Sequence, residues 1–184
     1  VPVRPHRVGE VDHELGQGGQ LAAQVREHVG EDRDDEQDHP DQHRHGEDAD
    51  QDAVLAAYER DVARIMEEGG YKSVDVVRVK PDNPNRTELR QKFLAEHTHD
   101  DDEVRFFVDG AGAFYLRRDG RVFQVVCERN DLISVPAGIT HWFDTGPAPD
   151  FCAIRIFTTP EGWVGHFTGD DIATRFPKFE SETA

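Results

Sequence analysis

The sequence has few of the residues and runs that mark several classes of protein. Its only two cysteines, Cys127 and Cys152, stand in apolar runs without CxxC spacing, which favours buried thiols in a reducing compartment over a disulfide framework. No apolar stretch reaches the roughly 18 to 20 residues of a membrane span, and the N-terminal region lacks the apolar run of a secretory signal. We therefore expect a soluble, cytoplasmic protein with no membrane partner.

Positive charge is also scarce. The chain has 21 lysines and arginines against 38 acidic residues, and its formal net charge is -17 at pH 7. This acidic balance repels phosphate backbones and anionic membranes, so we expect no nucleic-acid partner. A chain of 184 residues is long enough for one domain with a hydrophobic core, but short for two.

The N-terminal region contains no aromatic residue. All sixteen aromatic residues lie at position 58 or later, whereas residues 1–52 hold fifteen acidic groups against five arginines. Such a segment cannot bury enough apolar surface to offset the entropy lost on ordering. We expect residues 1–49 to be a disordered, acidic and atypical segment. We interpret its histidines His39, His43 and His45 as part of a solvated stretch rather than a metal site.

From residue 50 onward the pattern is that of a folded domain. An amphipathic helix is predicted from a cap at Asp50 or Asp52 to the Gly69-Gly70 stop, and a shorter helix over 86–94. A turn at 110–112, a hairpin signal at Asp119-Gly120 and a helical turn over 170–176 are also predicted. Strand-like runs occupy 71–80, 104–108, 113–117, 122–127, 132–135, 140–144, 151–157 and 163–167. Short strands at this spacing predict an all-β sandwich or barrel.

The strongest chemical signal is the cluster His97-Thr98-His99-Asp100-Asp101-Asp102-Glu103, followed downstream by His141. Alternate side chains of a strand share a face, so His97, His99 and Glu103 can point to one side. His141 follows a Pro-x-Gly turn that can start a strand directly across a barrel. Three neutral imidazoles and a carboxylate can hold a divalent first-row metal with positions left open for substrate and oxygen. A polar loop is the alternative, but it accounts for an HxH pair better than for all four residues.

Around these residues the sequence resembles the cupin superfamily. The two cupin motifs are matched, the second in part, by His97, His99, Glu103, Gly110, Pro136, Gly138 and His141. Asn130 stands where the second motif usually has a glycine, and Thr145 where it commonly has an asparagine. These departures affect the edges of the motif and leave the ligand set intact.

Within the cupins, the chain is similar to the acireductone dioxygenase family over about residues 50–179. The stretches that carry this similarity are 89–94, 96–107, 131–144, 160–163 and 168–171. The resemblance implies a mainly β fold, a cupin-type double-stranded β-helix or jelly-roll barrel with a few peripheral helices. Residues 180–184 are then a tail, and residues 1–49 do not resemble the family.

The resemblance also implies an enzyme of methionine salvage. A metal held by His97, His99, Glu103 and His141 would bind the acireductone 1,2-dihydroxy-3-keto-5-methylthiopentene and react it with O2. We expect one Fe2+ per chain, with formate and 4-methylthio-2-oxobutanoate as products. Ni2+ is the alternative, with formate, carbon monoxide and 3-methylthiopropanoate as products. No repeat or coiled-coil period suggests assembly, and we expect a monomer.

Five further residues are candidates for the site. The enediol substrate ionises readily, and Arg105 and Arg155 are candidate catalytic residues that can counter its negative charge. Arg105 is two residues after Glu103, so in a strand the two side chains point to the same face. A surface arginine on a strand is the alternative for each. Three aromatic residues are candidates for an apolar wall around the methylthio tail, with ordinary core packing as the alternative: Phe93, Phe143 and Trp163.

Two other functional classes fit the same ligands. A zinc- or manganese-dependent cupin isomerase would use them for proton transfer without O2. A non-enzymatic cupin binding module would keep the fold but need no open metal position. The stretches around the ligands, rather than the ligands themselves, favour the dioxygenase.

Overall fold

The computed structural model describes residues 8–10, 51–160 and 162–180 of the chain. Its strands are β1 (Val8–Glu10), β2 (Ser73–Val79), β3 (His97–Thr98), β4 (Glu103–Arg118), β5 (Arg121–Glu128), β6 (Leu132–Val135), β7 (Thr140–Asp144), β8 (Phe151–Phe157) and β9 (His166–Phe167). Its helices are α1 (Gln51–Ala57), α2 (Glu59–Gly69), α3 (Arg86–Leu94) and the 3-10 helix η1 (Ile172–Arg175). The mainly β fold class is therefore confirmed.

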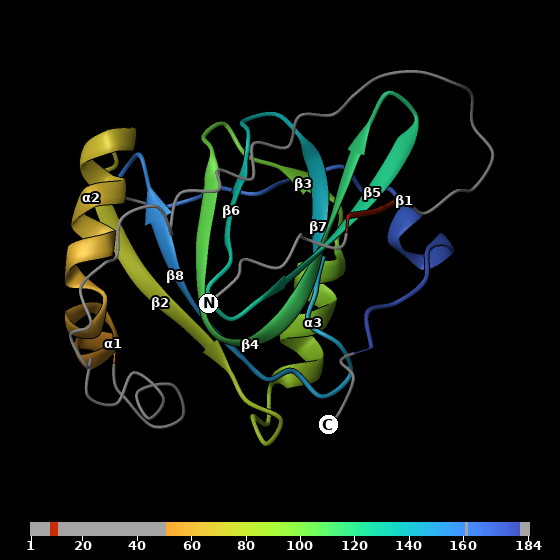
Figure 1. Cartoon of the computed structure of the whole chain (residues 1–184). Coiled ribbons are helices and arrows are strands. Elements are labelled where there is room, and N and C mark those ends of the chain that lie inside the picture. Colours follow the sequence, from red (N-terminus) through yellow and green to blue (C-terminus); the bar gives the residue numbers. More distant parts are fainter. Residues whose placement is uncertain (1–7, 11–50, 161, 181–184) are drawn as a thin grey trace.

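The strands form an antiparallel barrel in two halves that share β4 (Figure 1). One half has the order β1-β5-β4-β7-β3-β9, and the other has the order β2-β8-β4-β6. Helices α1 and α2 cover the outer face of β2 and β8, while α3 lies near β7 (Figure 1). The interior between the two halves is thus closed by strands, with helices only at the periphery.

Most of the predicted elements are confirmed, several with the predicted bounds: α3, β6, β7 and β8. The predicted hairpin joins β4 to β5. Asp119 and Gly120 have φ angles of 52° and 75°, the two positive values that a type I′ turn requires. Cys127 and Cys152 are free and buried, as expected from their apolar surroundings. None of the helices in the described part of the chain is long and apolar enough to cross a membrane.

The prediction of one continuous helix over residues 52–69 is wrong. The helix divides at Tyr58, whose φ of −114° and ψ of 15° lie outside the helical range. The Tyr58 ring packs edge-on against Phe106, with the ring centroids 5.3 Å apart. This contact depends on the underlying sheet, which the helical pattern does not encode. The predicted stop is confirmed, since Gly70 is left-handed and its N–H donates to the Met66 carbonyl.

The predicted turn at 110–112 is also wrong, because β4 runs through it. Gly110 has a φ of 68°, and a Cβ there would lie 1.9 Å from the Asp150 carbonyl oxygen. At Gly112 a Cβ would lie 2.4 Å from the Phe143 ring. The two glycines therefore permit close approach of neighbouring strands rather than a reversal of the chain.

An irregularity in β4 changes which residues face the interior. Its register with β8 shifts between Phe107 and Asp109, as at a β-bulge. Before the shift, odd-numbered residues such as Phe107 point into the barrel interior. After the shift, even-numbered residues such as Phe114 and Leu116 point into it. A single strand thereby supplies side chains to the barrel interior from both halves.

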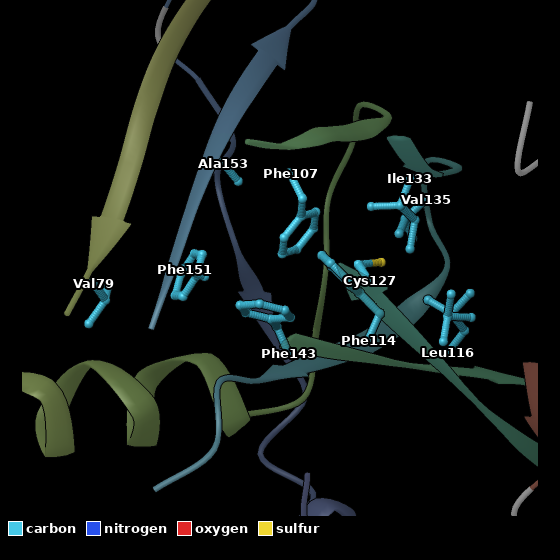
Figure 2. Close-up of a cluster of buried hydrophobic side chains, with 11 residues drawn as sticks. Val79, Phe107, Phe114, Leu116, Cys127, Ile133, Val135, Phe143, Phe151 and Ala153 are labelled. Carbon is cyan, nitrogen blue, oxygen red and sulfur yellow. The ribbon is translucent and has the colours of Figure 1, made fainter. Parts of the chain in front are cut away.

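The barrel interior is filled by apolar side chains, which extend as far as Leu116, the cross-strand partner of His141. The inner cluster consists of Val79, Phe107, Phe114, Leu116, Val125, Cys127, Ile133, Val135, Phe143, Phe151 and Ala153. Figure 2 shows these side chains converging from strands on opposite sides. Dense apolar packing of the interior holds the strands rigidly beside the polar cluster.

The two ends of the chain depart from the sequence-based expectations in different ways. At the C-terminal end only His166–Phe167 of the predicted strand 163–167 is a strand, and the predicted helical turn is the 3-10 helix η1. Of residues 1–49 the structure describes the backbone of β1, which pairs with β5. The rest of the predicted disordered segment, including His39, His43 and His45, lies outside the described residues.

Asp144 joins three parts of the fold at the end of β7. Its carboxylate is fully buried and accepts hydrogen bonds from Arg90 Nε (2.8 Å) and Nη2 (3.1 Å) on α3. It also accepts the backbone N–H groups of Gly146 and Phe179, each at 3.0 Å. A buried anion with four donors fixes α3 and the C-terminal segment against the barrel.

Replacing Asp144→Ala should lower the free energy of unfolding by about 3 kcal/mol, because a largely buried arginine and two backbone donors lose their acceptor. Urea denaturation followed by tryptophan fluorescence measures the change. Arg175→Ala is the control, since that side chain is 63% exposed and pairs with exposed Asp171. We expect the control to change stability by less than about 0.5 kcal/mol. Equal unfolding midpoints for the two variants would contradict the role given to Asp144.

Candidate metal centre

The four predicted ligands meet at one end of the barrel interior. His97 on β3 is paired with His141 on β7 across the antiparallel register, and Glu103 is the first residue of β4. One donor atom from each of His97, His99, Glu103 and His141 lies within 4.8 Å of the donors of the other three. His99, Glu103 and His141 are buried, and His97 is partly buried. The structure therefore brings together the whole predicted set.

Each histidine directs the same ring nitrogen away from the centre. Nδ1 lies 2.7 Å from the Ala95 carbonyl for His97, and 2.8 Å from the Ile139 carbonyl for His141. His99 differs, because its Nδ1 lies 2.8 Å from the carbonyl of Val164, 65 residues further along the chain. A carbonyl can only accept, so Nδ1 carries the proton in all three rings. Each Nε2 then presents a lone pair to the centre.

The arrangement of lone pairs shows that the donors fit a cation. Nε2 of His99 and of His141 lie 3.0 Å and 2.9 Å from the same oxygen, Oε2 of Glu103. With both Nδ1 atoms protonated, neutral imidazoles place no proton in these contacts. Metal–nitrogen bonds of about 2.1 Å at right angles would separate two donors by about 3.0 Å. The side chains thus fit a divalent metal bound through three Nε2 atoms and Glu103.

Glu103 is the fixed negative charge of the centre. Burial alone would raise the pKa of this carboxyl group, but the positive charge of Arg105 opposes burial, and the pKa is held well below its usual value. Burial lowers the pKa of His97 to about 4, so this ligand is neutral at physiological pH. For His99, hydrogen bonds to Glu103 and to the Val164 carbonyl outweigh burial and raise the pKa. A proton therefore competes with a metal at His99.

Arg105 lies beside the ligands and is buried, with 6% of its surface exposed. Its Nε is 2.7 Å from Glu103 Oε1, but the two groups are not aligned for a hydrogen bond. Neither Nε nor Nη1 of Arg105 has an acceptor among the described residues. The guanidinium carbon lies 5.2, 4.9 and 5.5 Å from the ring centroids of Phe114, Phe143 and Trp163. A buried cation with unused donors can bind an anionic oxygen.

Arg155 lies one strand further from the ligands, on β8, and is the partner of Arg105 in the β4–β8 register. Its side chain is 30% exposed and forms an ion pair with Asp75 on β2. The guanidinium carbon lies 5.5 Å from the Phe157 ring and 5.8 Å from the Trp163 ring. Arg155 is thus at the edge of the centre, where an incoming ligand can meet it.

The three predicted aromatic residues lie in different places. Trp163 is closest to the ligands, with its ring 5.8 Å from the His99 ring and its Nε1–H donated to the Asp102 carbonyl. Phe143 is buried beneath Arg105 and belongs to the inner cluster. Phe93 on α3 contacts Phe143, with ring centroids 6.0 Å apart. Trp163 and Phe143 therefore border the centre, while Phe93 supports Phe143 from outside.

Some groups at the centre were not predicted. Phe114 faces inward only because of the β4 bulge, and no sequence pattern identifies the Val164 carbonyl as the partner of His99. The sequence could have identified Asp75 as an inward-facing residue, because on β2 it lies at alternate positions with the inward-facing residues Val77 and Val79, on the same face of the strand.

Buried Glu96, also not predicted, precedes the first ligand. Its carboxylate accepts from Arg117 Nη1 on β4 at 3.1 Å and from Thr168 Oγ1 at 2.8 Å. These contacts hold the start of β3 between β4 and the segment after β9, and so position His97. A single acidic residue before an HxH pair does not predict this clamp.

Comparisons with known proteins point to one family. The sequence model of the ARD/ARD′ family matches residues 20–165. The chain is 88% identical over 140 residues to "Acireductone dioxygenase" of Parvibaculum lavamentivorans (strain DS-1), an alignment that covers 76% of each chain. It is 58% identical over 135 residues to the protein of that name from Serratia proteamaculans (strain 568), covering 73% of this chain and 75% of that one.

A solved structure is also similar. It is described as "Acireductone dioxygenase from Bacillus anthracis with cadmium ion in active center" and is 42% identical, with a TM-score of 0.59. The match covers 64% of this chain and 68% of that chain. The likeness extends to the fold as well as the sequence.

His99→Ala should abolish stoichiometric metal binding, because it removes a buried donor and the Val164 contact that orients it. Inductively coupled plasma mass spectrometry of the purified variant measures the metal. His166→Ala is the matched control, since His166 is half exposed, pairs with Asp100 and lies outside the four-ligand set. One equivalent of metal retained by the His99 variant would rule out the proposed centre.

Proposed function

The chain belongs to the ARD/ARD′ family, and from this we infer that it is a cupin-type, metal-dependent dioxygenase that acts on an acireductone. The observation that carries this function is the convergence of His97, His99, Glu103 and His141 on one point. These three histidines and one carboxylate would hold a divalent metal and would leave coordination positions open for other ligands. Open positions suit a reaction between a bound substrate and O2.

We propose that the chain carries one Fe2+, with Ni2+ as the alternative, because imidazole and carboxylate donors accept both metals. A bound divalent cation that chelates two oxygens of the enediol would favour the anionic, electron-rich form that O2 attacks. With Fe2+ the products are formate and 4-methylthio-2-oxobutanoate, as methionine salvage requires. With Ni2+ they are formate, carbon monoxide and 3-methylthiopropanoate. A monomeric, cytoplasmic enzyme remains a prediction.

Arg105 is proposed to bind the anionic substrate directly. Its Nε and Nη1 groups have no acceptor among the described residues, and its charge is only partly offset by Glu103. An enolate oxygen beside the metal ligands would accept from these donors in surroundings where charge–charge attraction is strong. Arg105 would thereby hold the substrate in its ionised form, and Arg155 would add a second positive charge at the edge.

Aromatic side chains are proposed to orient the apolar end of the substrate. Trp163 and Phe143 contact the Arg105 guanidinium, so they lie where a methylthio tail would extend from a metal-bound enediol. Sulfur–aromatic contacts favour such a tail. The same rings exclude water from the guanidinium, and Phe93 keeps Phe143 in place through their edge-to-face contact.

Oxygen uptake tests the proposed function. The full chain is loaded with either Fe2+ or Ni2+, metal content is measured, and acireductone is added in an oxygen electrode with gas analysis of the headspace. We expect one O2 consumed per acireductone with each metal, and carbon monoxide with Ni2+ alone. A fully loaded protein that isomerises a substrate without O2 would indicate the isomerase. One that binds without turnover would indicate the binding module.

Arg105→Lys should lower kcat/KM for acireductone by about 100-fold, because an ammonium keeps the charge but loses the planar array of donors. Metal content should not change, since Arg105 is not a ligand. Arg118→Lys serves as the control, because that side chain is 53% exposed and faces Asp119 in the hairpin. An unchanged kcat/KM in the fully loaded Arg105 variant would remove this residue from the mechanism.

A further inference from the structure

A row of charged side chains crosses the inner face of β2, β8 and β4. In the strand register Asp75 is paired with Arg155, and Arg155 is paired with Arg105. On β4 and β8 these positions share the parity of the inner-cluster residues Phe107 and Ala153. The row therefore leads from the edge of the barrel to the buried centre, and Asp75 is its outermost member.

Asp75 takes up one side of the Arg155 guanidinium. Nε of Arg155 donates to Oδ1 at 2.7 Å and Nη2 donates to Oδ2, so the contact is bidentate. A bidentate contact fixes the plane of the guanidinium as well as its position. Nη1 of Arg155 donates to no acceptor among the described residues. Because β8 lies between β2 and β4, the side away from Asp75 faces Arg105.

Among the described residues, only Asp75 fixes the orientation of the Arg155 guanidinium by hydrogen bonds. Its side chain is 30% exposed, and the nearby cation Arg105 repels it. The faces of Phe157 and Trp163 contact the guanidinium but leave it free to turn in its plane. Without Asp75 the long side chain would be able to extend into solvent, which both its hydration and the repulsion from Arg105 favour.

We propose that Asp75 is a positioning residue for substrate binding, which holds Arg155 so that its free Nη1 faces the anionic end of the substrate. This inference rests on the proposed function. It assigns to β2, a strand without a metal ligand, a part in selecting an ionised enediol over a neutral analogue. Asp75 acts through Arg155 and does not touch the substrate.

Positioning and simple charge predict opposite effects of the same substitution. If Asp75 acted only by its charge, Asp75→Asn would remove repulsion of an anionic substrate and lower KM. If Asp75 positions Arg155, the isosteric amide loses one acceptor of the bidentate pair and KM rises. The sign of the change in KM therefore separates the two roles.

The test uses the metal-loaded full chain in oxygen uptake with acireductone. We expect Asp75→Asn to raise KM about tenfold, with kcat changed less than about twofold and metal content unchanged. Asp150→Asn is the matched control, because Asp150 pairs with Lys80 at 3.0 Å just beyond the ends of the same two strands, outside the row. The control makes the same change of charge and should leave both constants unaltered.

A double-mutant cycle with Arg155→Lys shows whether Asp75 acts through Arg155. We expect Arg155→Lys to raise KM similarly, and Asp75→Asn to add less than about twofold in that background. An equal effect of Asp75→Asn in both backgrounds, or an unchanged or lower KM in the single variant, would overturn the inference.

Chemical modification measures the restraint on Arg155 without turnover. Phenylglyoxal labelling followed by peptide mapping should modify Arg155 several-fold faster in Asp75→Asn than in wild type or in Asp150→Asn. Equal rates would overturn the inference. Failure of the proposed function would give a different result from failure of this inference. In that case the wild-type chain itself would consume no O2, whatever the labelling rates.

Discussion

The buried Glu103 carboxylate is the interaction on which the site depends. An anion removed from water must be neutralised by neighbours, and this one has His99, His141 and Arg105 around it. The charge of Arg105 keeps Glu103 ionised, while the imidazoles direct lone pairs at a single point. A cation at that point would be bound by these lone pairs and by the carboxylate. The metal centre is therefore a consequence of how one charge is buried.

The backbone of β4 makes that burial possible. Glu103 and Arg105 lie in its first half, which pairs with β6 and β8, while its second half pairs with β5 and β7. The bulge after Phe107 and the close approach at Gly110 let one strand belong to both halves of the barrel. The charged residues thus lie beside a packed apolar interior, where water is scarce and their mutual attraction is strong.

Charged side chains extend in a row from the centre to the barrel edge. Two arginines lie between two carboxylates, and each arginine has one carboxylate partner, Glu103 for Arg105 and Asp75 for Arg155. The pairs are neutral by themselves, so a bound divalent metal leaves an excess of positive charge. That excess would suit an ionised enediol. Aromatic faces cover the guanidinium groups and restrict their contact with water.

Local features of this fold follow from the amino-acid sequence. Strand alternation places Glu103 and Arg105 on one face of β4, and the positive φ angles of the Asp119-Gly120 hairpin follow from its residue types. The expectation that His97, His99 and Glu103 share one strand is wrong, because β3 ends at Thr98 and β4 begins at Glu103. The turn before residue 86 predicts the bounds of α3, and hydrophobic patterns predict those of three strands, because neighbouring residues decide both. Tertiary structure decided what depends on distant partners. The division of the helix at Tyr58, the passage of β4 through Gly110, the Val164 carbonyl that orients His99 and the pairing of Asp75 with Arg155 all join segments far apart in the chain. No local pattern encodes them, since each exists only once the barrel has closed.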